Sequence, residues 1–168
     1  MDHFEKYFQR NKAEYPHSFP DGLDMIVIVP VLDDREIFQT LESLCCCRIA
    51  DEKVGVLVVV NHPEAVETAL KERNRALAYE LKQWIARHPV SGIRIEVIEA
   101  FDLPAKSAGV GLARKIAMDE AAYYFYRQGR MDCPIASLDA DTLVVPEYLT
   151  GIIRKFRNSR VAGVTLAY

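Results

Sequence analysis

The stretch Ile135-Ala136-Ser137-Leu138-Asp139-Ala140-Asp141-Thr142 decides how the rest of this chain is interpreted. A short apolar run that delivers two carboxylates is typical of a buried strand whose end opens into a site, because open α/β sheets bind ligands beyond the carboxyl ends of their strands. Side chains at i and i+2 of a strand share a face, so Asp139 and Asp141 converge if the strand continues through them. The stretch therefore predicts a strand followed by a paired-carboxylate site.

Two chemical interpretations of the acidic pair are open. Two carboxylates packed closely repel each other, and a divalent cation that carries phosphate oxygens compensates such a pair. The alternative is a solvated turn, since Asp is common where strands end. The other segments of the sequence are needed to distinguish the metal site from the solvated turn.

Composition is that of one globular domain. The chain has 168 residues, of which 50% are apolar and 27% are charged, and its net charge of -3 indicates no dedicated nucleic-acid surface. No apolar run has membrane-spanning length, and the opening Met-Asp-His-Phe-Glu-Lys lacks the apolar core of a signal peptide, so a cytoplasmic location is expected. The four cysteines, three of them contiguous at 45–47, have neither a disulfide-framework pattern nor a zinc-site spacing.

Strands and helices alternate along the chain. Apolar runs predict strands at 25–30, 54–60, 93–98 and 134–138, with a further strand starting near 161–168. Apolar residues at helical spacing follow each of the first four predicted strands. They predict a helix that starts at Asp33 and further helices near 64–87, 110–128 and 146–158. This order predicts a mostly parallel, right-handed α/β layer with helices on both faces. Residues 1–24 are expected to form a preliminary helix and loop, and residues 25–168 the domain.

Local signals predict where several helices begin and end. Asp33 and Glu36 have the spacing of a capping box, and Asn61 or His62 is expected to cap the helix over 64–87, with Pro63 in its first turn. Gly129 is expected to end the helix over 110–128.

Polar residues follow the predicted strands and would meet at one edge of the sheet. They include Asp33, Asn61 and Asp139, and this edge is where a nucleotide is expected. The segment Ala108-Gly109-Val110-Gly111-Leu112-Ala113-Arg114-Lys115 adds glycines that let backbone approach a ligand, a helix N-terminus that favours anions, and a forked donor on Arg114. It lacks the third glycine of a dinucleotide fingerprint, which counts against a dehydrogenase. The alternative for Arg114 is an ion pair with Asp119 or Glu120.

Taken together, these segments resemble the nucleotide-binding half of a family 2 glycosyltransferase of the GT-A fold. The resemblance covers nearly the whole chain from Met25 and implies binding of a nucleoside-diphosphate sugar, with hexosyl transfer to an acceptor by inversion. It implies nucleotide contacts from the end of the first strand, the end of the second, the Gly109–Lys115 segment and the D-x-D motif, which holds Mn2+ or Mg2+. Carried over, the nucleotide-binding residues are Pro30, Leu32, Asp33, Asn61, Arg114 and Asp139, and the metal ligands are Asp141 and Asp139.

The chain also departs from the family pattern. Pro30-Val31-Leu32-Asp33 stands where the family usually has Pro-x-Tyr-Asn, Asn61-His62 replaces a paired Asp, and Lys115 replaces an Asn. The sequence stops at Tyr168, before the acceptor half that supplies the family's catalytic base, so the domain is expected to be incomplete and the base to lie beyond Tyr168. The sheet edge near 161–168 could then pair with a second copy.

Two other functions compete with this one. A nucleotide-binding module that keeps the fold without turnover would also lack the acceptor half. A haloacid-dehalogenase-type phosphatase uses a D-x-D-x-T motif, which Asp139-Ala140-Asp141-Thr142 fits, but that motif normally opens the catalytic domain rather than coming late in the chain. Donor sugar, base, acceptor and linkage are not encoded in any motif of the chain.

Overall fold

The central feature of the fold is a four-stranded parallel sheet. The computed structural model describes residues 3–11, 15, 17–105, 109–159 and 161–164. Its strands are β1 (Met25–Val31), β2 (Val54–Pro63), β3 (Ile93–Leu103) and β4 (Ile135–Ser137), in the order β3-β2-β1-β4. The predicted α/β class with a parallel sheet is confirmed. The chain runs outward from β1 to β3 and then returns to the other side of β1, so the direction of winding changes between β1 and β4.

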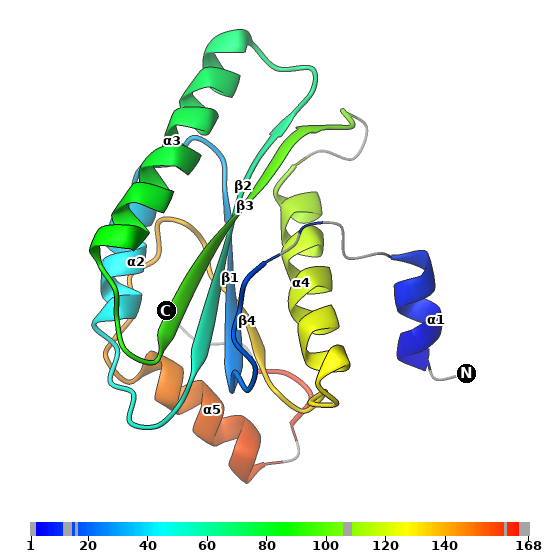
Figure 1. Cartoon of the computed structure of the whole chain (residues 1–168), viewed down its shortest axis with the longest axis vertical. Helices are drawn as coiled ribbons and strands as arrows, with labels where there is room; N and C mark the ends of the chain where they lie inside the picture. The colour runs from blue at the N-terminus through cyan, green and yellow to red at the C-terminus, as the bar shows by residue number, and fades with distance from the viewer. Residues whose placement is uncertain (1–2, 12–14, 16, 106–108, 160, 165–168) are drawn as a thin grey trace.

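Helices cover both faces of the sheet, as Figure 1 shows. One face carries α2 (Ile37–Cys45), α3 (Thr68–Arg87) and α5 (Tyr148–Asn158), and the other carries α4 (Val110–Arg127). The short helix α1 (His3–Arg10) lies outside α4, where the Phe8 ring packs on the rings of Tyr123 and Tyr126. Because β1 and β2 are covered on both faces, their apolar runs are uninterrupted, and every residue of β1 is buried.

Side chains of β1 and β2 alternate between two cores. Val27 and Val29 pack in the core beneath α2, α3 and α5, whereas Ile26 and Ile28 pack beneath α4. In β2 the residues that share the α4 core are Leu57 and Val59. This alternation determines which face each residue near the strand ends belongs to.

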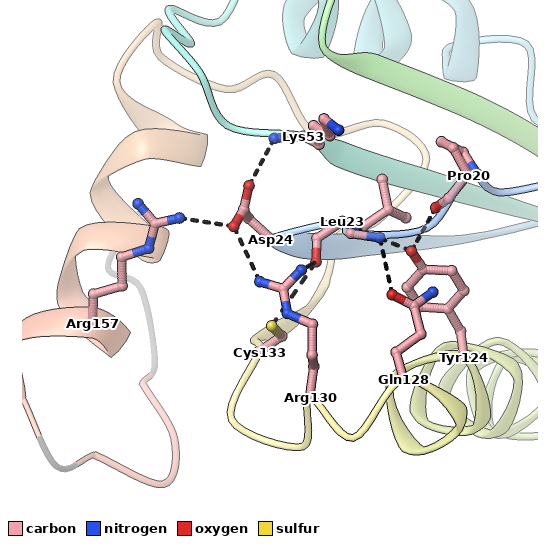
Figure 2. Close-up of polar contacts among 10 residues, drawn as sticks. Pro20, Leu23, Asp24, Lys53, Tyr124, Gln128, Arg130, Cys133 and Arg157 are labelled. Carbon is pink, nitrogen blue, oxygen red and sulfur yellow. Dashed lines mark hydrogen bonds and ion pairs between the residues drawn. The ribbon is translucent and has the colours of Figure 1, made fainter.

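A polar network holds the amino-terminal edge of the sheet together (Figure 2). The Asp24 carboxylate accepts hydrogen bonds from the Lys53 amide at 2.9 Å, from Arg157 at 2.8 Å and from Arg130 at 3.2 Å. It thereby joins the start of β1 to the start of β2, the last turn of α5 and the loop after α4. The Tyr124 hydroxyl donates to the Pro20 carbonyl at 2.6 Å and accepts from the Leu23 amide at 3.1 Å.

Several element boundaries differ from the sequence predictions. The predicted helix start near residue 64 is wrong: β2 continues through Asn61 and His62 to Pro63, and α3 begins only at Thr68. The predicted capping box is also wrong, because α2 begins at Ile37 and its N-cap, Glu36, makes no side-chain cap bond. The Asp34 carboxylate accepts from the Glu36 amide instead.

At the other boundaries, β3 runs on to Leu103, beyond the predicted end at residue 98. The predicted end of α4 is confirmed: Gly129 has φ +66°, and the amides of Gly129 and Arg130 bond back to the carbonyls of Tyr126 and Phe125. Residues 161–164 are not in a strand, and the rest of that predicted strand lies outside the described residues. None of the helices in the described part of the chain is long and apolar enough to cross a membrane.

Candidate functional site

The strand order reverses between β1 and β4, and the carboxyl ends of these two strands, with the residues beside them, are called the crevice below. The two strands pair only from Ile26 to Ile28, against Ile135–Ser137, and the same register would place Pro30 opposite Asp139. The Ile26 amide donates to Pro134 and the Ile28 carbonyl accepts from Leu138, so backbone groups at even positions of β1 face β4. Pro30 has no N–H to continue this ladder. The β1–β4 ladder therefore ends at the point where the winding reverses, and open α/β sheets bind ligands at such points.

Pro30 and Asn61 lie on the α4 face of this edge. They continue the alternation of Ile28 and Val59, which pack beneath α4. Asn61 is 1% exposed, and its Oδ1 has no hydrogen-bond partner among the residues that the structure describes. Leu32, the first residue after β1, is 44% exposed. The crevice thus has an apolar, exposed side chain and an unsatisfied amide oxygen on one side.

Asp33 is not brought to this group of residues. It has φ +50°, and its carboxylate accepts from Arg73 Nε of α3 at 2.7 Å, on the opposite face of the sheet. Its amide donates to Asn74 Oδ1 at 2.8 Å, and Asn74 Nδ2 donates to the Asn61 carbonyl at 3.1 Å. Asn74, fully buried on α3, therefore ties the ends of β1 and β2 together. The sequence signal for it is an amide within the apolar stripe of α3, and sequence reasoning missed it.

Arg114 of α4 reaches across the crevice to Asp139. Its Nη2 forms an ion pair with Asp139 Oδ1, with the two side chains 37% and 50% exposed. The two nearby carboxylates that the sequence offered to Arg114 have other partners. Asp119 binds Tyr7 and Lys115, and Glu120 accepts a hydrogen bond from the Tyr15 amide. Arg114 Nε is buried and has no acceptor among the described residues. The guanidinium is thus only partly satisfied by the protein.

The acidic pair lies in a turn rather than on the strand. β4 ends at Ser137, and the turn is closed by a bond from the Thr142 amide to the Asp139 carbonyl at 3.2 Å, so strand geometry, the condition for the two side chains to share a face, does not extend through the aspartates. Both carboxylates are exposed. Thr40 of α2, fully buried, donates to the Ala140 carbonyl between them at 2.6 Å. One turn further along α2, Ser43 Oγ accepts from the Val144 amide at 3.2 Å, so α2 holds the turn at two points.

The ligands that this edge offers to a metal ion are few. No group of three or more His, Cys, Asp or Glu side chains in the described part of the chain is placed to hold a metal ion. Mg2+, which is bound through one or two carboxylates plus substrate phosphates rather than in an all-protein cage, needs fewer protein ligands. Two exposed carboxylates on a fixed turn, Asp139 and Asp141, match that requirement.

A second polar cluster lies where β2 and β3 end. His62 is fully buried, stacks on Phe101 with ring centroids 4.8 Å apart, and has Nδ1 3.4 Å from the Asp102 amide. Asp102 has φ +54° at the irregularity between the strands and lies 2.5 Å from Lys71 and 3.6 Å from Arg75. The hydrogen bond from Lys71 lowers the pKa of Asp102, with smaller contributions from the charges of Lys71 and Arg75. His62 is enclosed by protein, so it is not an open metal ligand.

The chain also has a cavity away from this edge. It measures about 570 Å3 and lies between the C-terminal end of α3 and β3, with Ile85, Val90 and Ile95 in its lining. It holds no convergent group of catalytic side chains and faces the free edge of β3. The chemistry-bearing residues lie at the carboxyl edge instead.

No protein-family model matches this chain, and neither does any curated protein sequence. What the chain does is therefore inferred from the geometry of its carboxyl edge.

Proposed function

We propose that this chain binds a nucleoside-diphosphate sugar in the crevice between β1 and β4, as the donor-binding part of a GT-A glycosyltransferase. The observation that carries the proposal is the end of the β1–β4 ladder before Pro30, where the winding reverses, next to the Arg114–Asp139 ion pair. Crevices of this kind are the ligand sites of open α/β sheets.

Each part of the crevice suits a part of such a ligand. Leu32 offers exposed apolar contact to a base. The Asn61 amide oxygen is unsatisfied but enclosed, so a base N–H reaches it only after a local rearrangement. The guanidinium of Arg114 has the fork that matches phosphate oxygens, and its Nε lacks an acceptor. Asp139 is assigned to the ribose and, with Asp141, to a Mn2+ or Mg2+ ion.

The chemistry divides between this chain and groups outside it. A divalent ion, when bound, stabilises the charge of the departing nucleoside diphosphate. The chain's own residues bind and orient the donor through the base, the diphosphate and the ribose. Inverting transfer also needs a base that takes the proton of the acceptor hydroxyl. The proposal assigns donor binding to this chain and assigns no residue as that base, and a binding module without turnover is the alternative function.

Calorimetry with UDP, GDP, CDP and ADP, each with and without Mn2+, tests the proposal. We expect one of them to bind in the presence of Mn2+ and to lose most of its affinity when Mn2+ is omitted. Asp141→Asn should remove the metal dependence, whereas the matched control Asp132→Asn, an exposed aspartate in the loop before β4, should keep it. Absence of binding by folded protein, or binding that ignores Mn2+ and Asp141, would contradict the proposal.

A turnover assay separates the two forms of the function. Hydrolysis of the matching nucleotide sugar by the chain would indicate a catalytic centre, and binding without hydrolysis would favour the non-catalytic module. Release of phosphate from p-nitrophenyl phosphate, lost in Asp139→Asn, would instead support the phosphatase interpretation of the same acidic pair.

A further inference from the structure

We infer that Arg114 and the divalent cation compete for Asp139, so that the Arg114–Asp139 ion pair occupies the site until metal and diphosphate arrive together. The inference rests on the proposed function for the identity of the diphosphate. The competition between guanidinium and cation for one carboxylate can be measured without any nucleotide.

The carboxylate side of the pair is held in place. Asp139 lies in a turn that is closed on itself by the Thr142 amide. The neighbouring Ala140 carbonyl accepts a bond from the buried hydroxyl of Thr40, and Val144 is held by Ser43. These contacts tie the turn to α2, which is itself packed in the core through Ile37, Leu41 and Leu44. The turn is therefore the fixed partner.

The guanidinium side is the movable one. Arg114 is a long side chain on the surface of α4, 37% exposed, and its ion pair with Asp139 is its charged contact among the described residues. Its Nε is shielded from water yet has no acceptor in the described part of the chain. A buried donor without a partner is costly, so an anionic oxygen that reaches Nε stabilises a different position of the guanidinium. The resting position of Arg114 is thus incompletely satisfied.

Competition follows from the chemistry of the shared carboxylate. A cation that coordinates Asp139 repels the guanidinium beside it. A guanidinium released from Asp139 is free to bind phosphate oxygens through its fork. Coupling between two ligands is reciprocal, so a diphosphate that draws Arg114 away frees Asp139 for the metal, and the metal in turn frees Arg114 for the diphosphate. Metal and diphosphate therefore bind with positive cooperativity, in addition to their direct contact.

The test begins with Mn2+ alone. Paramagnetic broadening of the backbone amide signals of residues 139–142 is followed during Mn2+ titration of the full chain, the Arg114→Gln variant and the Lys115→Gln variant. Lys115 is the matched control because it loses the same charge one residue further along α4, where it pairs with Asp119 and approaches Asn11. We expect Arg114→Gln to broaden at an about two- to fivefold lower Mn2+ concentration, the range of a partly exposed ion pair, and Lys115→Gln to follow the unmodified chain.

The second arm uses the nucleoside diphosphate that binds best, with Mn2+ present. Arg114→Gln should weaken its binding by about tenfold or more, because charge-assisted bonds to phosphate are lost. Opposite changes in the two arms support the competition. It is overturned if Arg114→Gln binds Mn2+ no more tightly than the unmodified chain, or if Lys115→Gln tightens Mn2+ binding equally. Failure of every nucleotide to bind overturns the proposed function instead, and the Mn2+ titration still decides whether Arg114 competes at Asp139.

Discussion

The two edges of the parallel sheet differ in how completely their buried polar groups are hydrogen-bonded. At the amino-terminal edge, the Asp24 carboxylate accepts from three donors and Tyr124 bonds in both directions, as Figure 2 shows. At the carboxyl edge, Asn61 Oδ1, His62 Nε2 and Arg114 Nε are buried without partners among the described residues. The amino-terminal edge also has one such atom, His17 Nδ1 beside the Tyr124 ring, so three of the four unpaired atoms in the described part of the chain lie at the carboxyl edge.

This difference separates stability from binding. Buried polar groups are normally paired, because an unpaired group loses its bonds to water without replacement. The three unpaired atoms near the carboxyl ends of the strands therefore lower the stability of the folded chain at this edge. Substitutions of hydrogen-bonded polar groups should lower the free energy of unfolding at either edge, and substitutions of the unpaired groups at the carboxyl edge should mainly change what the protein binds.

The largest effect on stability is expected from Asp24→Asn. The change removes the charge that Arg130 and Arg157 share, and an amide cannot satisfy both guanidinium groups and the Lys53 amide. We expect a loss of about 2–3 kcal/mol in the free energy of unfolding, measured by urea denaturation. Asp21→Asn, which disturbs one exposed bond to Gln128, is the control and should cost much less. Unchanged stability of Asp24→Asn would break the contrast between the edges.

The same carboxylate predicts a pH dependence. Burial raises the pKa of Asp24, but bonds from the Lys53 amide, Arg130 and Arg157 outweigh it, so the pKa lies below its ordinary value. A lowered folded-state pKa gives stability that is present above the unfolded-state value of about 4 and lost as the pH falls through the folded-state value. Urea midpoints of the unmodified chain and Asp24→Asn should therefore differ at pH 7 and converge as the pH is lowered from about 5 towards 2. A difference that stays constant over this range would contradict the assignment.

Thr40→Val should have a smaller effect on stability and a second effect on binding. The substitution leaves the buried Ala140 carbonyl without its donor, which costs about 1–2 kcal/mol in unfolding free energy. It also releases the acidic turn from α2, so Mn2+-dependent nucleotide affinity should fall. Thr40→Ser keeps the hydroxyl and should retain both properties. Loss of stability without any change in binding would show that the turn does not need this anchor.

Asn61→Leu should change stability least. The amide oxygen that it removes has no partner, so we expect a shift within about 1 kcal/mol in urea denaturation, together with weaker nucleotide binding by calorimetry. Asn74→Leu is the matched comparison, because that amide makes two buried bonds and its loss should cost about 2 kcal/mol or more. Equal destabilisation by the two substitutions would remove Asn61 from the candidate site.

The fold was largely predictable from the chain, and the site only in part. Strands covered on both faces need apolar residues throughout, so the runs that became β1 and β2 were recognisable, and Gly129 marked the end of α4. The end of β2 was not recognisable, because Asn61 and His62 resemble a turn and the amide that holds this end, Asn74, comes thirteen positions later. A distant partner also overrides the local prediction at Asp33. The spacing predicted a helix cap, but the Asp33 carboxylate binds Arg73 of α3 instead. Arg114 likewise binds Asp139 rather than the nearby acidic residues of its own helix.

Pro30 gives the crevice a property that side-chain chemistry alone could not. A residue with an N–H at that position would offer a donor to the Leu138 carbonyl, and the ladder between the two strands could then continue to Asp139. The proline ring removes that donor, so the β1–β4 ladder ends here whether or not a ligand is bound. Valine at this position would restore one donor towards β4, while the turn that follows would still be held by Thr40 and Ser43.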